Sequence, residues 1–215
     1  MSSAPTFKRL PRAVREQQML DAAVRVFSRR GFHTASMDEI AEDAGISKPM
    51  VYAYLGTKET LFVACLHREG TRMMEAIVGA VGAELSPDEQ LWRGLRAFFG
   101  FVGAHRDGWT VLYRQARGEQ RFADELAAMR TRVVEVVATL LRRNLPTETP
   151  DVRPVRDTDL EVMAYALVGA AESLADWLAD HPNEDPERLA TRLMNATWLG
   201  AGHLRLGHLW HPPSV

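Results

Sequence analysis

The stretch SMDEIAEDAGISKPMVYAYL, residues 36–55, decides the fold that this sequence predicts. Ser36 and Glu39 form a capping box, in which the Ser36 hydroxyl accepts from the Glu39 amide and the Glu39 carboxylate reaches back to the Ser36 N–H. A short helix follows, and Gly45 supplies the left-handed residue that a tight turn requires. Ser47 can then cap a second helix. Two short helices joined by a glycine turn are therefore expected here.

The apolar residues of this stretch fit two helices that cross steeply. Such a crossing needs a small residue at the contact, a glycine in the turn and apolar anchors beyond it. The chain supplies this set together, in Ile40, Ala41, Gly45, Ile46 and Val51. A generic helical corner does not need all of these features at once. The pattern predicts a helix-turn-helix, with residues 47–54 as the recognition helix that enters the major groove of DNA.

The rest of the chain also has the periodicity of helices. Apolar residues at i, i+3, i+4 and i+7 predict an amphipathic helix from about residue 12 to residue 30, and Gly31 ends it with Phe32 as the accompanying hydrophobic contact. Further helices are expected near residues 58–83, 87–105, 108–117, 121–144, 157–180 and 186–206. No segment of the sequence alternates apolar and polar residues for long enough to indicate a strand. The predicted fold class is all-α, with about nine helices.

Composition narrows the class of protein further. The chain has 215 residues, of which 46% are hydrophobic and 25% charged, as in soluble globular proteins. Its apolar runs fall short of the roughly 20 residues of a membrane helix, and its first residues lack the apolar segment of a secretory signal. The single cysteine, Cys65, cannot form an internal disulfide and is expected to be buried. A cytoplasmic protein without a metal, a cofactor or a membrane contact is predicted.

Charge is unevenly distributed along the chain. Residues 1–30 carry seven basic and two acidic side chains, a net +5, so the remainder sums to −7 in a chain of net charge −2. A basic segment beside an acidic body indicates an anionic partner for that segment. Residues 1–11 are predicted to be a flexible basic arm. Lys8, Arg9 and Arg12 could lie along the DNA minor groove or belong to a tail without a fixed contact, and the sequence leaves both open.

The residues around the predicted turn resemble a known family. The stretch GISKPMVYAYLGTKETLF, residues 45–62, resembles the DNA-binding signature of TetR-family transcriptional regulators. So does the upstream pattern Ala22–Ala23, Phe27, Gly31–Phe32 and Ile40–Ala41. The resemblance covers residues 12–62, and the later chain has the length and helical layout of that family's regulatory domain. One departure is visible, because the family often has a hydroxyl residue where this chain has Ala35, and the threonine here is Thr34.

The resemblance implies an organisation and a function. Residues 12–57 would be the helix-turn-helix DNA-binding domain, and residues 58–215 would be the ligand-binding and dimerisation domain. The implied function is that of a ligand-responsive transcriptional regulator, a repressor that binds a palindromic operator as a homodimer. A small-molecule inducer would release it from the DNA. The helix from residue 58 would connect the two domains.

Each residue near the DNA has an expected role. Lys58 begins a helix, so its ammonium and the free N–H groups of the first turn could converge on one phosphate. Lys48 can donate to guanine or to phosphate, while Pro49 and Met50 offer apolar contacts to a thymine methyl. The resemblance places Tyr52 on the DNA backbone, whereas Tyr54 either reaches the backbone or is structural. The expected DNA-binding set is Thr34, Ser36, Ser47, Lys48, Pro49, Met50, Tyr52, Tyr54 and Lys58.

The last two long helices are candidates for a dimer interface. Both combine leucines with small residues, which let helices approach closely. In the resembled family, these two helices form a four-helix bundle between subunits. The expected interface residues are Leu167, Ala171, Leu174, Leu193, Thr197 and Ala201. A bundle that stays within one chain is the alternative.

The middle of the chain is rich in aromatic residues and could hold a ligand. A mostly apolar cavity with a few polar groups is what a small-molecule site requires. The candidates are Trp92, Phe98, Phe99, His105, Trp109, Tyr113 and Arg114, and for any one of them alone the sequence favours a place in the core over a ligand contact. With the resemblance, some of them are expected to line an inducer pocket, where Arg114 would pair with an anionic or carbonyl group.

A carrier or an enzyme that uses this aromatic cavity is the alternative function. The sequence lacks the nucleophile-elbow, P-loop, dinucleotide-binding and zinc-protease motifs, so no enzyme is predicted. A second alternative is an architectural DNA protein without ligand control. His203, His208 and His211 do not share one helix face, and no metal site is expected there.

Overall fold

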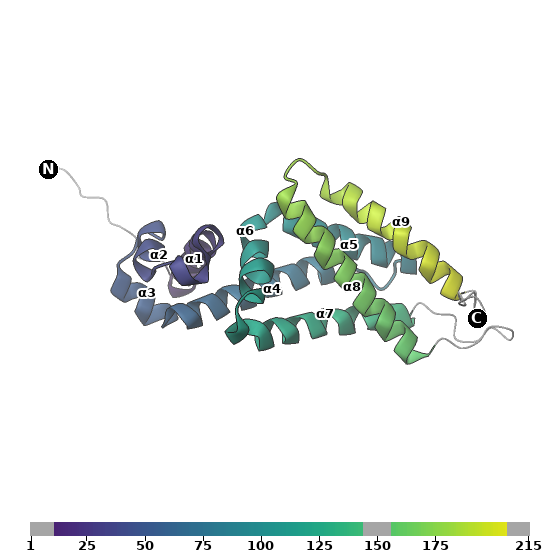
Figure 1. Cartoon of the computed structure of the whole chain (residues 1–215), viewed down its shortest axis with the longest axis horizontal. Coiled ribbons are helices and arrows are strands. Elements are labelled where there is room, and N and C mark those ends of the chain that lie inside the picture. The colour runs from purple at the N-terminus through teal and green to yellow at the C-terminus, as the bar shows by residue number, and fades with distance from the viewer. Residues whose placement is uncertain (1–10, 144–155, 206–215) are drawn as a thin grey trace, which may run out of the picture. The chain divides into compact units, whose positions relative to one another are not determined.

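The computed structural model of the chain describes residues 11–143 and 156–205, and every regular element within these ranges is helical (Figure 1). The prediction of an all-α fold with about nine helices is confirmed. The α-helices are α1 Arg12–Thr34, α2 Met37–Asp43, α3 Lys48–Leu55, α4 Lys58–Ala80, α5 Pro87–Ala104, α6 Arg106–Trp109, α7 Ala123–Arg143, α8 Asp157–Asp180 and α9 Pro186–Arg205. A π-helical turn, η1 (Thr110–Gln115), and a 3₁₀ turn, η2 (Gln120–Phe122), lie between α6 and α7.

The chain forms two compact units. The first contains Met1–Glu69 together with Asp107–Phe122, and the second contains Gly70–Arg106 together with Ala123–Val215. The segment from α6 to η2 therefore packs with the N-terminal helices rather than with the helices that flank it in sequence. The predicted domain bounds, 12–57 and 58–215, concern function and stay a prediction, because compactness does not say which residues bind DNA or a ligand.

Glycines shape the first unit at its two turns. Gly31 has φ 76° and interrupts the helical course near the end of α1, where the sequence places the stop. Gly45 has φ 66° in the turn between α2 and α3, as predicted. The capping box at α2 forms only in part: Ser36 Oγ accepts from the Glu39 amide at 3.1 Å, whereas the Glu39 carboxylate accepts from Arg30 Nε at 3.0 Å. The expected return bond from Glu39 to the Ser36 amide is replaced by an ion pair to α1.

Four phenylalanines form the aromatic core of the first unit. Phe62 of α4 lies with its ring centroid 5.0 Å from that of Phe27 and 5.1 Å from that of Phe32, both on α1. Phe122 of η2 stacks on Phe62 at 4.4 Å and meets Phe32 edge-on at 5.1 Å. Aromatic pairs of this kind stabilise a fold beyond the free energy of the surface area that they bury. Phe122 therefore holds the end of the inserted segment, Asp107–Phe122, against α1 and α4.

The start of the inserted segment is held in the same unit. Asp107 Oδ1 accepts from Ser28 Oγ of α1 at 2.7 Å. Gly108 lies so close to α4 that a Cβ atom added there would stand 2.6 Å from Oε2 of Glu69, a carboxylate that is 2% exposed. The predicted helix over 108–117 is thus observed as the short α6 followed by η1, a π-helical turn that the sequence did not reveal.

The second unit is a bundle of longer helices. α5 packs mainly on α9, and α7 packs on α8 through a core that centres on Val134, Ala138, Ala164 and Val168. Arg106 caps the C-terminal end of α8: its Nη1 donates to the carbonyl oxygens of Leu178 at 2.9 Å and Ala179 at 3.2 Å. Cationic side chains at a helix C-terminus satisfy carbonyls that have no partner within the helix.

Helix α8 has an apolar character that extends beyond this core. Among the described residues it is the one helix long and apolar enough to cross a membrane, with mean hydropathy 1.2 over 18 residues. This is weak support for a membrane segment, because the core helix of a soluble protein meets the same criteria. Only 33% of the stretch is buried inside the structure, and the exposed large hydrophobic side chains on α8 are Val162, Tyr165 and Trp177.

Candidate nucleic-acid interface

The first turn of α3 is presented to solvent. Ser47, Lys48 and Pro49 are exposed, whereas Val51 on the opposite face is fully buried and anchors the helix. Ser47 is the N-cap residue, as predicted, but its side chain makes no capping hydrogen bond; the turn is closed by backbone bonds such as Met50 N–H to Ser47 O at 2.9 Å. The arrangement is that of a recognition helix with its N-terminal residues outward.

Lys48 is paired with an acid of the preceding helix. Its Nζ donates to Asp38 Oδ2 of α2 at 2.9 Å, and both side chains are largely exposed, 47% for Lys48 and 67% for Asp38. The hydrogen bond and the charge of Asp38 raise the pKa of Lys48 above its ordinary value. Lys48 is therefore a cation at every physiological pH, with a carboxylate already at its ammonium group.

Residues of α1 contact the other side of the recognition helix. Arg15 Nη1 lies 3.8 Å from Met50 Sδ, and the Arg12 guanidinium lies 5.2 Å from the centroid of the Tyr54 ring. Tyr54 is half-buried, and this cation–π contact gives it a structural partner. Tyr52, by contrast, is 45% exposed and has its side chain available on the surface of α3.

Lys58 joins the start of α4 to the junction between α1 and α2. Its Nζ donates to the carbonyl oxygens of His33 and Ala35, each at 3.1 Å, and lies 4.8 Å from the centroid of the Phe32 ring. A lysine ammonium has three N–H donors, so two carbonyls leave one for a further acceptor. Thr34 and Ser36, in the same junction, are exposed. Lys58 thus supports the segment that leads into α2 in addition to any phosphate contact.

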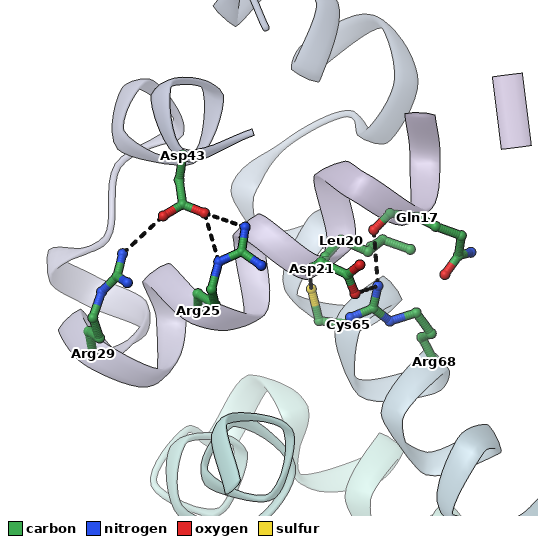
Figure 2. A network of polar contacts seen from close by, with 8 residues as sticks. All are labelled: Gln17, Leu20, Asp21, Arg25, Arg29, Asp43, Cys65 and Arg68. Carbon is green, nitrogen blue, oxygen red and sulfur yellow. Dashed lines mark hydrogen bonds and ion pairs between the residues drawn. The ribbon is translucent and has the colours of Figure 1, made fainter. Parts of the chain in front are cut away.

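The acids of α2 bind arginines of α1, and sequence reasoning missed this pairing. Asp43 accepts from Arg25 at 2.9 and 2.6 Å and from Arg29 at 3.2 Å (Figure 2), while Glu39 accepts from Arg30. Partial burial acts to raise the pKa of Asp43, but the hydrogen bonds from both arginines outweigh it and hold the pKa below its ordinary value. The +5 charge of residues 1–30 is therefore partly offset by α2, and the two pairs of acids in MDEIAED, which stand four positions apart on one helix, were the signal.

A second network in Figure 2 holds α1 against α4. Arg68 Nη1 lies 2.8 Å from Asp21 Oδ1 and donates to the Gln17 carbonyl oxygen at 3.2 Å. Its Nη2 lies 2.7 Å from Glu69 Oε1. Cys65, one turn earlier on α4, is buried as predicted, with Sγ 3.9 Å from the Leu20 carbonyl oxygen. The recognition helix thus belongs to a unit whose helices are joined on both sides of α1.

Comparison with known proteins identifies this architecture. The profile of bacterial regulatory proteins of the TetR family matches residues 19–65, which contain the helix-turn-helix. The profile of the tetracyclin repressor-like C-terminal domain matches residues 87–200, more than half of the chain. The chain belongs to the TetR family. It is a DNA-binding transcriptional regulator, and the prediction that it is a regulator rather than an enzyme is confirmed by the names of its relatives.

Relatives and solved structures of the TetR family cover nearly the whole chain. The transcriptional activator FasR of Mycolicibacterium smegmatis is 28% identical over 200 residues, spanning 92% of this chain and 88% of that protein. The regulator EthR of the same species is 26% identical, over 87% of this chain and 85% of its own. A TetR-like regulator from Rhodococcus sp. RHA1 has a crystal structure with TM-score 0.76 and 49% identity, covering 90% of this chain and 99% of that one.

The seven residues expected around a TetR-family inducer fall in both compact units. Trp92, Phe98 and Phe99 of α5 and the α5 C-cap residue His105 belong to the second unit, and Trp109, Tyr113 and Arg114 to the first. Phe98, Phe99 and Trp109 are buried, whereas Arg114 is exposed. Trp92 Nε1 donates to Thr191 Oγ1 of α9 at 3.4 Å, and Tyr113 stacks on Trp109 at 4.6 Å. Their role as a ligand site stays a prediction.

The expected dimer residues separate into two groups. Leu167, Ala171 and Leu193 are buried within the second unit of the chain itself. Leu174 and Thr197 are half-buried, and the Ala201 side chain lies outside the described part. Among the described residues, no three His, Cys, Asp or Glu side chains group to hold a metal ion. Lys8, Arg9, His208 and His211 also lie outside the described ranges.

Proposed function

We propose that this TetR-family protein binds a palindromic DNA operator as a dimer and is released from it by a small, mostly apolar molecule. The observation that carries the DNA half of the proposal is the exposed first turn of α3, where Ser47, Lys48 and Pro49 stand outward on a helix anchored by the buried Val51. Such a turn fits the major groove, whose base edges it would read. Since operator DNA lies in the cytoplasm, the protein acts there.

A dimer follows from the geometry of DNA. One helix-turn-helix buries little surface, and two recognition helices must lie about 34–36 Å apart to enter successive major grooves. One face of α8 supports this step, because its residues recur at helical spacing and are small or apolar: Val162, Ala166, Ser173 and Trp177 are exposed, and Gly169 is half-buried. Leu167 and Ala171 would support the interface from within the core, while Val162 and Trp177 would meet the partner. This face was not in the set expected from the sequence.

The ligand half rests on family membership and on the aromatic residues of α5. We place the inducer against this cluster, with Phe98 and Phe99 supplying apolar surface. A ligand shifts the protein only if it binds the free and DNA-bound states with different affinity. We propose that the protein is a repressor, so that its release by the ligand would allow the genes that it controls to be transcribed. FasR carries the name of an activator, so the direction of control is the part of the proposal to measure in cells.

Selection of duplexes from a random library by the full chain tests the DNA half. The expected result is a palindrome with half-sites one helical turn apart. Lys58→Ala should weaken binding to every duplex, whereas Met50→Ala should change which sequence is preferred, because phosphate contacts position and base contacts specify. A selection that returns no common sequence, with binding that depends only on salt, would refute operator recognition and favour an architectural protein. Calorimetry showing equal ligand affinity with and without operator would refute the coupling.

A further inference from the structure

The inference concerns Asp38 and rests on the proposed function. Three acids of α2 accept hydrogen bonds from basic residues, but their partners differ. Glu39 and Asp43 bind arginines of α1, so their pairs join two scaffold helices. Asp38 instead binds Lys48, the first residue of the recognition helix. In the described part of the chain, the Asp38–Lys48 ion pair thus joins α2 to α3 and involves a residue expected to contact DNA.

The pair is not needed to hold the turn together. Val51, Ile40 and Ala41 of the two helices are buried, and the backbone bond from Ile46 N–H to Ala41 O at 3.0 Å closes the turn. Asp38 is 67% exposed and Lys48 47% exposed, so both side chains stand at the surface that would face DNA. Ion pairs at such exposure contribute little to stability. Their larger effect is on what else the lysine can bind.

We propose that Asp38 is a specificity-determining residue. It holds the Lys48 ammonium and thereby suppresses contact of that ammonium with the phosphates of DNA of any sequence. A phosphate of any DNA offers Lys48 an anion, but Lys48 can bind it only by leaving Asp38 unpaired before the negative backbone or by holding the phosphate and the Asp38 carboxylate, two like charges, beside one another. A guanine edge is uncharged and therefore does not repel the Asp38 carboxylate in this way. Lysine has three donors, so one N–H can stay on Asp38 while another donates to O6 or N7. Asp38 therefore penalises random DNA more than an operator with guanine at this position.

Charge removal at position 38 tests this with a matched control. Asp38→Asn removes the charge and keeps the side-chain size. Glu42→Gln removes the same charge one turn further along the same helix, at an exposed residue outside the expected DNA contacts. Each full-length variant is titrated, by fluorescence anisotropy at several salt concentrations, against a random-sequence duplex and against the selected operator. Circular dichroism melting confirms that both variants fold.

For Asp38→Asn, affinity for random duplex should rise about tenfold, and the slope of log K against log salt should become more negative by about 1, the value for one further phosphate contact. Affinity for the operator should rise less than about threefold, so the ratio of the two affinities falls. Glu42→Gln should change both affinities by the same small factor and leave the ratio unchanged. In a Lys48→Met background, Asp38→Asn should act no more strongly than Glu42→Gln.

Two results would overturn the proposal. One is an equal gain on both duplexes for Asp38→Asn, which would make it a general charge effect. The other is a gain that persists without the Lys48 ammonium. Failure of the proposed function is separate, because it appears in the parent protein as the absence of any selected operator. The random-duplex titrations and the Lys48→Met background still decide the role of the pair in that case.

Discussion

Arg25 of α1 and Asp43 of α2 are joined by two hydrogen bonds to one carboxylate oxygen, with Nε at 2.9 Å and Nη2 at 2.6 Å from Oδ2 (Figure 2). Arg29 reaches the other oxygen at 3.2 Å. α3 begins five positions after α2 ends, so the orientation of α2 strongly constrains the recognition helix. The Arg25–Asp43 ion pair between α1 and α2 thus contributes to the placement of the exposed side chains of α3.

Asp43→Asn should lower the free energy of unfolding at neutral pH. It should also reduce the loss of that free energy when the pH is lowered. The pKa of the folded-state carboxyl lies below its ordinary value of 3.8, so the contribution is present above that value and is lost as pH falls through the lower, folded pKa. At pH 7 the loss should be about 1 kcal/mol, the upper end for pairs near the surface. Urea melts at pH 7 and pH 3 measure it, with Glu42→Gln as the charge control. Equal midpoints for Asp43→Asn and the parent at pH 7 would contradict it.

Gly45→Ala should destabilise the first unit through backbone strain alone. Gly45 has φ 66°, and an added Cβ would meet no atom within 4 Å, so no clash contributes. A left-handed conformation costs an L-residue about 1–2 kcal/mol. Gly45→Asn should cost less, because asparagine tolerates this region better. Chemical denaturation of both variants measures the difference, and an alanine variant as stable as the asparagine one would argue against strain.

Gly108→Ala should destabilise the protein for the opposite reason, a clash. The new Cβ would lie 2.6 Å from Glu69 Oε2 and 3.1 Å from its Cδ, and Glu69 is buried and held by Arg68. Crowding of a packed site of this kind costs about 1–3 kcal/mol. Gly100→Ala on α5 is the matched comparison, because its Cβ would meet nothing and should stabilise the helix by about 0.5–1 kcal/mol. Thermal melts showing the same sign for both variants would refute the packing argument.

Cys65 should be unreactive in the folded protein. Burial raises the pKa of its thiol to about 12, so almost no thiolate exists at pH 8 and the group is shielded as well. A disulfide exchange reagent should modify the native protein far more slowly than the urea-unfolded chain. Labelling at the unfolded rate without denaturant would mean that α4 opens readily around this residue.

Val162→Glu should weaken a dimer without unfolding the subunit. Val162 is 62% exposed in the single chain, so a carboxylate there is solvated in the monomer but would be buried in the proposed interface. Sedimentation analysis should show that the dissociation constant of the dimer rises by about tenfold or more, while the far-UV circular dichroism spectrum is unchanged. Glu161→Gln, at the adjacent exposed position, is the control. A variant that remains fully dimeric would place the interface elsewhere.

Short-range patterns predicted most of the fold. The turn at Gly45, the stop at Gly31 and the bounds of the long helices follow from caps, glycines and apolar spacing, which are local. The pairing of Arg25 with Asp43 joins residues 18 positions apart, and a charge sum cannot reveal it. Leu167 and Leu193 have the spacing of an interface, but periodicity marks an apolar face without saying what covers it. Here the same subunit does.

The insertion of Asp107–Phe122 into the first unit bears on protein engineering. A fragment ended at Glu69 would keep every residue of the helix-turn-helix yet lose Phe122, whose ring covers Phe62 and Phe32. Its exposed aromatic surface would favour aggregation. Chimaeras that exchange regulatory domains between such proteins should therefore move Asp107–Phe122 together with the helix-turn-helix. A single cut in the sequence does not separate the first unit from the second.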